Sequence, residues 1–374
     1  MRILISGGGT GGHIYPALAV ARELQARYNA EILYMGDANG LETKIVPEAG
    51  LPIVTITAGK LRRYLSWRTF TDVGRVPVGM MQALRQVQRF DPDAAFTSGG
   101  YVSVPAGLAA RVEGVPLLMH QQDVPPNLAN RLLMPFATRI SVSFSDSLRY
   151  FPRKRTILAG NPVREEILAM VGGDAAALKT QLGFSPDLPL LLVTGGSQGA
   201  RHLNQVVVEA LPELLMRCQV LHVSGGLTYQ ATSRAAAHQL APLPALASRY
   251  RLYPYLNEEM PAALAASDIA LCRSGASTLT ELAVMGRPSV LVPLPPGFTG
   301  SPQAANAEMF RRAGAAEVVL DRVLTPTSLG AALYPLLDSA PRRALMASAA
   351  RSMGHPEATA TLAETVAAIA RRRK

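Results

Sequence analysis

Two glycine-rich turns, each between an apolar strand and a helix, restrict the possible folds of this chain more than any other feature of the sequence. The first, residues 7–13 (GGGTGGH), follows a strand expected over Arg2–Ser6 and precedes a helix expected over residues 16–27. The second, residues 195–201 (GGSQGAR), follows a strand that ends at Thr194. Such turns let the backbone close on a phosphate, toward which the helix N–H groups and dipole point. Two of them predict two anion-binding lobes, with a turn that merely needs positive φ as the alternative at each.

The strand-and-helix pattern continues through both halves of the chain. In the first half, strands are expected over Arg2–Ser6, Ala30–Met35, Ile53–Ile56, Ala94–Thr97, Pro116–His120 and Arg139–Val142. In the second half, they are expected over Leu188–Thr194, Val220–Ser224, Arg251–Tyr253, Asp268–Cys272, Ser289–Val292 and Ala316–Leu320. This alternation is typical of parallel sheets wrapped by helices. The expected fold class is therefore α/β, with two Rossmann-like doubly wound domains facing each other across a cleft.

A turn signal, residues 160–164 (GNPVR), separates the two series. We expect an N-terminal domain over residues 1–162 and a C-terminal domain over residues 163–350. A chain of 374 residues with 48% hydrophobic and 17% charged residues is long and apolar enough for two such cores. A last helix, near residues 355–374, is expected to pack back on the first domain.

The cysteine content and the N-terminal residues indicate in which cellular compartment the protein is expected. Cys218 and Cys272 are the only cysteines, and their spacing suits neither a disulfide framework nor a metal site. The apolar start runs into glycines after six residues, which is too short for a signal peptide. We therefore expect a cytoplasmic protein.

The net charge of +10 favours phosphates, nucleic acid or an anionic membrane surface as partner. Between Lys60 and Arg89, seven basic residues face a single acid, Asp72, and alternate with apolar and aromatic residues such as Trp67 and Phe70. That mixture is typical of a membrane interface. No nucleic-acid-binding motif accompanies it, so a membrane surface is expected and nucleic acid is not.

Further polar motifs follow the expected strands, where ligands gather in open α/β sheets. They are residues 99–103 (GGYVS), residues 120–123 (HQQD) and residues 272–278 (CRSGAST), the last of which opens a helix that carries Glu281. His13 stands beside the first glycine turn, where an imidazole that titrates near neutral pH suits acid–base chemistry. A histidine that only caps the loop is the alternative.

Two other site types are weighed against these. Gly7, Gly9 and Gly12 fit the dinucleotide fingerprint, with Asp37 as a ribose-binding acid, so an oxidoreductase stays open. Asp91-Pro92-Asp93 has the form of a metal-binding pair but precedes a strand instead of following one. We expect these aspartates to form a turn, and we expect no metal site and no cofactor.

Taken together, the glycine turns and the motifs at residues 99–103, 160–164 and 273–276 resemble the MurG family, the N-acetylglucosaminyltransferases of peptidoglycan synthesis. Five motifs in the same order span nearly the whole chain. The resemblance implies the two-domain GT-B fold and a UDP-N-acetylglucosamine donor. It also implies an undecaprenyl-pyrophosphoryl-N-acetylmuramoyl-pentapeptide acceptor, at the cytoplasmic face of the cell membrane, to which the protein would bind peripherally.

The resemblance also implies roles for residues. His13 would be the catalytic base of an inverting displacement. The donor-binding residues would be Asn130, Arg164, Ser197, Gln198, Leu256, Glu281 and Gln303. The acceptor-binding residues would be Thr10, Gly11, Gly12, Tyr101, His120 and Asp123. The donor would lie on the C-terminal domain, and the acceptor and the membrane on the N-terminal domain.

The chain departs from the family pattern at two places. The family usually shows His-Glu-Gln-Asn where this chain has His120-Gln121-Gln122-Asp123, and two adjacent glutamines where it has Pro302-Gln303. A proline cannot replace an amide that hydrogen-bonds a sugar, so a different hexose or acceptor is an alternative. An epimerase of UDP-N-acetylglucosamine and a nucleotide-sensing protein without activity are the others.

Overall fold

A computed structural model describes residues 1–58, 67–196, 199–295 and 303–371, without side chains for residues 67–76. Contacts divide the chain into two units. The first unit is Met1–Arg164 with His355–Lys374, and the second unit is Glu165–Gly354. Each unit is one parallel sheet with helices, so the expected α/β class with two Rossmann-like domains is confirmed. Within the described ranges, no helix combines the length and apolar character needed to cross a bilayer.

The sheet of the first unit has the strand order β3-β2-β1-β4-β5-β6-β7, with every pair parallel. Its strands are β1 (Arg2–Ser6), β2 (Glu31–Asp37), β3 (Ile53–Ile56), β4 (Ala94–Thr97), β5 (Leu117–Gln121), β6 (Arg139–Val142) and β7 (Thr156–Leu158). The sequence predicted the first six. It missed β7, because three half-exposed residues after a basic run carry no buried-strand pattern.

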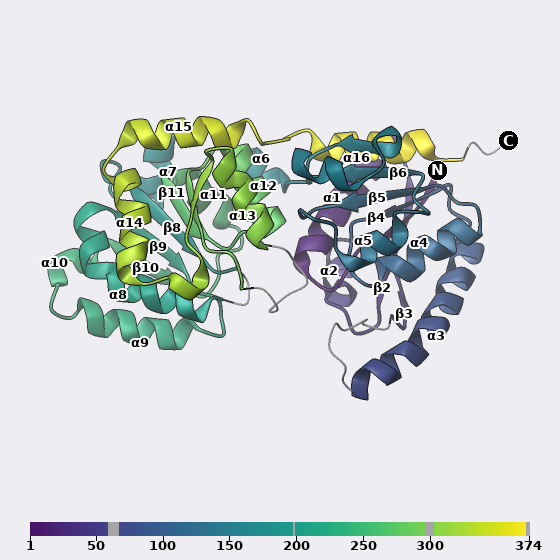
Figure 1. The fold of residues 1–374 in the computed structure, drawn as a ribbon, viewed down its shortest axis with the longest axis horizontal. Coiled ribbons are helices and arrows are strands. Elements are labelled where there is room, and N and C mark those ends of the chain that lie inside the picture. Colours follow the sequence, from purple (N-terminus) through teal and green to yellow (C-terminus); the bar gives the residue numbers. More distant parts are fainter. Residues whose placement is uncertain (59–66, 197–198, 296–302, 372–374) are drawn as a thin grey trace. The chain divides into compact units, whose positions relative to one another are not determined.

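Helices cover both faces of this sheet. The helices of the first unit are α1 (Gly11–Tyr28), α2 (Glu42–Glu48), α3 (Trp67–Phe90), α4 (Ser103–Val112), α5 (Leu128–Leu133) and α16 (Ala358–Ile369), with short 3-10 turns η1 (Ser145–Tyr150) and η2 (Arg153–Arg155). α16 lies beside α1 (Figure 1), and its Leu362, Ala363 and Val366 are buried in the same cluster as residues of α1. The opposite face is packed by α3, α4 and α5.

α1 begins at Gly11, earlier than the expected position 16. Thr10 is its N-cap in extended conformation, and Gly11, Gly12 and His13 form its first turn. Glycine is a poor helix former, so its presence hid the start of the helix from sequence analysis. His13 therefore belongs to the helix and not to the loop before it.

The second unit repeats the topology with the order β10-β9-β8-β11-β12-β13. Its strands are β8 (Leu190–Thr194), β9 (Gln219–Val223), β10 (Tyr250–Tyr253), β11 (Ile269–Cys272), β12 (Ser289–Leu291) and β13 (Ala316–Val318). Its helices are α6 (Glu165–Leu168), α7 (Ala175–Gln181), α8 (Arg201–Arg217), α9 (Tyr229–Leu240), α10 (Pro244–Ala247), α11 (Met260–Ala266), α12 (Ala276–Met285), α13 (Gln303–Arg312), α14 (Pro326–Leu337) and α15 (Ala340–Arg351), with the 3-10 turn η3 (Asp321–Val323). All six expected strands are present.

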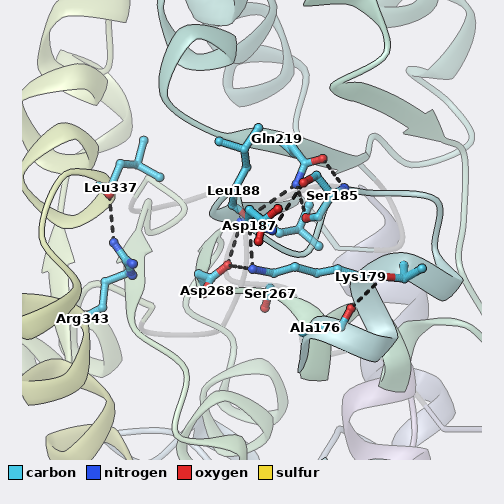
Figure 2. A network of polar contacts seen from close by, with 12 residues as sticks. Ala176, Lys179, Ser185, Asp187, Leu188, Gln219, Ser267, Asp268, Leu337 and Arg343 are labelled. Atoms are coloured by element: carbon cyan, nitrogen blue, oxygen red, sulfur yellow. Dashed lines mark hydrogen bonds and ion pairs between the residues drawn. The ribbon is translucent and has the colours of Figure 1, made fainter. Parts of the chain in front are cut away.

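A partly buried ion pair fixes the amino edge of the second sheet (Figure 2). Lys179 of α7 donates to the carbonyl of Leu188 at 3.1 Å and lies 2.7 Å from the carboxylate of Asp268. The same carboxylate accepts the backbone N–H of Leu190 at 2.7 Å. The pair therefore joins α7 to the starts of β8 and β11, at the edge opposite to the glycine turns.

The strand order places the ligand-binding edge of each unit. In both sheets the order reverses between the first and the fourth strand, β1 and β4 in the first unit and β8 and β11 in the second. Loops that leave these two strands diverge to opposite faces, which opens a crevice at the carboxyl edge. The glycine turns after β1 and β8 lie at these two points, as do the polar turns after β4 and β11.

Candidate functional site

In the first unit, two glycine turns interlock at the carboxyl edge. Gly99 and Gly100 follow β4 with φ of 110° and 88°, and the N–H of Gly8 donates to the carbonyl of Gly99 at 3.3 Å. A Cβ on Gly100 would collide with the backbone of Gly8. Any other residue here would push the two turns apart, because positive φ and this close approach both require glycine.

The first turn of α1 is open to a ligand. Thr10 is exposed and no side chain of the described residues caps the helix. Gly9 has φ of 86°, which directs the chain into the helix. Uncapped N–H groups at a helix start attract anions. Thr10, Gly11 and Gly12 thus lie together at the crevice of the first sheet, as the sequence placed them.

His13 is clamped between the two turns. Its Nδ1 lies 3.1 Å from the carbonyl oxygen of Ser98, which can only accept, so Nδ1 carries a proton and Nε2 is the basic nitrogen. The hydroxyl of Ser98 donates to the His13 carbonyl at 2.6 Å, and a Cβ on Gly99 would come within 2.9 Å of the ring. Burial lowers the pKa of His13, while Asp123, the Ser98 carbonyl and Glu42 act to raise it.

Tyr101 and Asp37 are joined beside this turn. The Tyr101 hydroxyl donates to Asp37 at 2.7 Å, and the other carboxylate oxygen accepts the N–H of Ala58 at 3.2 Å. Burial, and then the bond to Asp37, raises the pKa of the Tyr101 hydroxyl, which keeps it protonated as a donor. Both oxygens of Asp37 are therefore bonded within the protein, whereas a ribose-binding acid needs them for the ligand.

Glu42 is a buried carboxylate beneath the site that the sequence did not reveal. It is fully buried under the first glycine turn, where it accepts the N–H groups of Asp37 at 2.9 Å and Gly9 at 3.4 Å. A Cβ on Gly8, Gly36 or Gly40 would overlap its side chain. The glycines that make room for it come from three separated positions, so no local motif marks the site.

The His120–Asp123 segment lies deeper than its strand-end position suggested. The His120 ring is fully buried, with its nitrogens 2.9 Å from the Ser141 hydroxyl and 3.1 Å from Asn161 Oδ1. Burial lowers its pKa to about 4, so the ring is neutral at pH 7. Asn130 is also fully buried and donates to the His120 carbonyl at 2.9 Å. Direct contact of His120 or Asn130 with a substrate stays a prediction.

In the second unit, the turn after β8 leads into α8, whose N-terminus has no side-chain cap among the described residues. Gly196 and Gly199 have φ of 80° and 77°, and the Gly199 N–H donates to the Gly196 carbonyl at 2.9 Å. Ser197 and Gln198, the predicted diphosphate contacts, lie outside the described residues. The described residues here are thus two glycines with left-handed backbone, joined by a hydrogen bond, and an open helix start.

A buried relay supports that turn from below. Asn204 of α8 donates to the Ser224 carbonyl at 2.9 Å and to the Thr228 hydroxyl at 3.0 Å. The side-chain oxygen of Asn204 lies 3.0 Å from Nε2 of His222. The Nδ1 of His222 lies 3.0 Å from the Tyr250 hydroxyl. Burial lowers the pKa of His222 to about 3, so this imidazole is neutral and donates through one nitrogen only. The relay fixes which way the Asn204 amide points.

A second open helix start, that of α12, lies at the same edge. Gly275 is its N-cap in extended conformation and provides no side-chain cap, while Glu281 lies half-buried within the helix. The Ser274 hydroxyl donates to the Gln303 carbonyl at 2.8 Å, and Gln303 Oε1 accepts the N–H of Leu294 at 3.0 Å. Gln303 is thus fixed next to the start of α12.

The other predicted donor residues lie at chain turns. Leu256 is half-buried in the loop between β10 and α11, after the carboxyl end of its strand. Arg164 is half-buried at the end of the first unit, directly before α6.

Asp91 and Asp93 bind Arg2: Asp93 accepts the backbone N–H of Arg2 at 2.7 Å, and Asp91 pairs with its guanidinium at 2.8 Å. Across the described part of the chain, no cluster of metal-ligating side chains exists.

Comparison with known proteins gives a consistent result. Residues 3–142 match the glycosyltransferase family 28 N-terminal domain, and residues 190–362 match its C-terminal domain. The chain is 40% identical over 371 residues, 98% of both chains, to the UDP-N-acetylglucosamine--N-acetylmuramyl-(pentapeptide) pyrophosphoryl-undecaprenol N-acetylglucosamine transferase of Moorella thermoacetica. It is 39% identical, over 99% of both chains, to the enzyme of the same name from Desulforudis audaxviator. The solved structure of Acinetobacter baumannii MurG is similar with a TM-score of 0.79 and 28% identity, over 98% of this chain and 99% of that one.

Proposed function

The chain belongs to the MurG family within glycosyltransferase family 28, and from that premise we propose that it transfers N-acetylglucosamine from UDP-N-acetylglucosamine to undecaprenyl-pyrophosphoryl-N-acetylmuramoyl-pentapeptide. The observation that carries this proposal is the position of His13 at the crevice of the first sheet. Its Nδ1 donates to the Ser98 carbonyl, so Nε2 is the nitrogen that can accept a proton. A base is what an inverting transfer to a hydroxyl requires.

The donor is assigned to the second unit. The open starts of α8 and α12 both lie at the crevice of its sheet, and each offers N–H groups and a positive dipole end to the UDP diphosphate. Glu281 supplies a carboxylate that can accept the ribose hydroxyls. Gln303, anchored through Leu294, is placed to donate through its amide nitrogen.

The acceptor is assigned to the first unit, where His13 is the base. The acceptor hydroxyl oxygen forms a bond to the anomeric carbon while the bond from that carbon to the diphosphate oxygen breaks. His13 Nε2 takes the hydroxyl proton, and UDP leaves as the anion. The N–H groups at the start of α8 stabilise the charge that develops on the diphosphate, which lowers the barrier to displacement.

A transfer assay tests the function. The protein is incubated with a panel of UDP-sugars and a short-chain lipid-linked muramoyl acceptor, and UDP release and glycolipid formation are measured. We expect turnover with UDP-N-acetylglucosamine only when the acceptor is present, whereas turnover without it would favour an epimerase. His13→Ala should lower kcat about a hundredfold or more with donor binding unchanged; near-normal turnover would remove His13 from the mechanism.

Peripheral binding to the anionic cytoplasmic face of the membrane is the second part of the proposal. On α3, Met81 is 53% exposed next to the exposed Arg85, and on and after α5, Leu132 and Phe136 are each 42% exposed near the exposed Arg131. Exposed apolar side chains among cations suit an anionic lipid surface. The aromatic residues Trp67 and Phe70 lie where side chains are not described.

Sedimentation with liposomes tests membrane binding. We expect the protein to sediment with vesicles that contain phosphatidylglycerol and not with vesicles of phosphatidylcholine alone. Serine at Met81 and Phe136 should reduce the bound fraction several-fold, because each substitution removes exposed apolar area that would be buried in the lipid. Unchanged sedimentation of this double variant would contradict the assignment of the surface.

A further inference from the structure

We propose that Asp321 is a positioning residue of the donor site, and that its carboxylate fixes the spacing between the start of α8 and the turn after β11. This inference rests on the proposed function, because it assumes that the UDP diphosphate binds at these two helix starts. It adds to that function a residue that acts through two others and does not itself need to touch the donor.

The carboxylate of Asp321 links the two sides of the crevice. One oxygen lies 2.6 Å from Nη1 of Arg273, and the other lies 3.2 Å from Nδ1 of His202. His202 is the second residue of α8, and Arg273 lies in the turn between β11 and α12, two residues before the N-cap Gly275. A carboxylate can only accept, so both nitrogens donate to it. Asp321 therefore joins the two turns that lead into the open helix starts.

Asp321 reaches this position from a third strand. It opens the 3-10 turn η3, which follows β13 at the carboxyl edge of the same sheet. In the order β8-β11-β12-β13, its side chain has to pass the end of β12 to contact Arg273. The side chains of Asp321 and Arg273 are only 15% and 11% exposed. Because most of the water is excluded, the two charges attract each other more strongly than they would in bulk solvent.

The guanidinium of Arg273 is held through one nitrogen. Besides Asp321, its Nη1 donates to the carbonyls of Val292 at 3.0 Å and Pro293 at 3.4 Å, directly after β12. Its Nε is buried and has no hydrogen-bond partner on the residues that the structure describes. Within those residues, Asp321 is the one carboxylate that pairs with Arg273. Without it, a largely buried cation would keep only carbonyl contacts, and such an arrangement is costly.

The spacing of the two helix starts matters for an anion that both of them bind. α8 and α12 follow the neighbouring strands β8 and β11, from which helices diverge to opposite faces of the sheet. A side-chain link between their first turns therefore sets how far apart the open N–H groups lie. A site whose donors are already in place binds more tightly, because less conformational freedom is lost on binding. The contacts of Asp321 provide this preorganisation.

Calorimetric titration with UDP tests the inference without any transfer. We expect Asp321→Asn to raise the dissociation constant of UDP about tenfold, the factor that corresponds to one charge-assisted hydrogen bond. His202→Leu should weaken binding less, because the contact with Arg273 remains. The double variant should bind about as weakly as Asp321→Asn, since both substitutions cut the same link.

The other end of α8 offers a matched control. There Arg217 pairs with Asp338 at 2.5 Å, and both side chains are exposed. Asp338→Asn removes a carboxylate from the same helix, away from the crevice, and should bind UDP as tightly as the wild type. Unchanged UDP binding in folded Asp321→Asn, or an equal loss in Asp338→Asn, would overturn the inference.

Hydrogen–deuterium exchange of the ligand-free protein gives a readout that needs neither substrate. Asp321→Asn should speed exchange in the N-terminal half of α8 and in residues 272–278, whereas Asp338→Asn should affect only the C-terminal end of α8. Unchanged exchange at the first two segments in Asp321→Asn would contradict the link. A wild-type protein that binds no UDP would refute the donor assignment, and the exchange result would still decide whether Asp321 holds the two turns.

Turnover separates positioning from loss of folded protein. In Asp321→Asn, KM for the UDP-sugar should rise together with the dissociation constant of UDP, while KM for the lipid acceptor stays unchanged. Partial unfolding would instead lower kcat and leave both KM values as they are. That second pattern would show that the residue serves stability alone, and it would overturn the inference.

Discussion

Gly199 and Gly196 form a matched pair for testing how the turn after β8 is built. Both have the same left-handed backbone, with φ of 77° and 80°. Among the described residues, no atom would lie within 4 Å of a Cβ on Gly196. A Cβ on Gly199 would lie 2.5 Å from the Ser224 carbonyl oxygen and 2.6 Å from the Thr228 hydroxyl. Alanine at each position therefore separates backbone strain from steric overlap.

The two costs can be worked out from these contacts. Positive φ costs a non-glycine residue about 1–2 kcal/mol, and this term is common to both variants. Overpacking against a backbone carbonyl adds about 1–3 kcal/mol in Gly199→Ala alone, since the carbonyl is held by Asn204 and cannot retreat freely. For a unit of this size, 1 kcal/mol shifts the unfolding midpoint by about 2–4 °C. We expect the midpoint of the second unit to fall about 2–8 °C in Gly196→Ala and clearly further in Gly199→Ala.

Thermal unfolding without ligand, followed by far-UV circular dichroism, measures this difference. Calorimetric titration with UDP at a temperature where both variants are folded gives the second measurement, and Gly199→Ala should bind UDP more weakly than the wild type. Equal midpoints for the two variants would refute the argument that the turn rests on the Ser224 and Thr228 oxygens.

Two further predictions concern stability. Burial lowers the pKa of His120 to about 4 and the pKa of His222 to about 3. Below pH 6.5 the unfolded chain therefore binds protons at these rings that the folded chain does not bind. The free energy of unfolding is thus highest above pH 6.5 and falls as the pH drops toward 4. Each ring should lower the free energy of unfolding by on the order of 3 kcal/mol. Urea unfolding at pH 7 and pH 4.5 measures this change. If the free energy of unfolding of His222→Gln depends on pH as strongly as that of the wild type, His222 is excluded as a source. Lys179→Met should destabilise the second unit by about 3 kcal/mol, because it leaves Asp268 without its cation. Transfer should continue at the normal rate in that variant when assayed below its unfolding midpoint, since the pair lies at the edge away from the glycine turns; loss of turnover at full stability would contradict this placement.

The sequence predicts the architecture well, because its strongest signals are local. Buried aliphatic runs mark twelve strands, and the glycine turns mark where two of them meet helices. β7 escaped because a short, half-exposed edge strand has no such run. The start of α1 was missed because its first two residues are Gly11 and Gly12, which are poor helix formers.

The site is less predictable, because its partners meet only in three dimensions. The position of His120 at the end of a strand predicted the sheet edge at which it lies. It did not predict how deeply the ring is buried, because its partners Ser141 and Asn161 come from other segments of the chain. Glu42 and the relay from Asn204 to His222 join separate elements, so neither leaves a spacing that can be read along the chain.

The packing of α16 on α1 has a consequence for how the protein is made. Leu362, Ala363 and Val366 complete a core whose other buried members lie between Ile3 and Ala159. The ribosome must finish the entire second unit before this helix emerges, so the second unit can acquire its native core while the first still waits for its final piece. Nascent chains that stall before residue 358 would carry an exposed apolar face on α1, which makes them substrates for chaperones and proteases.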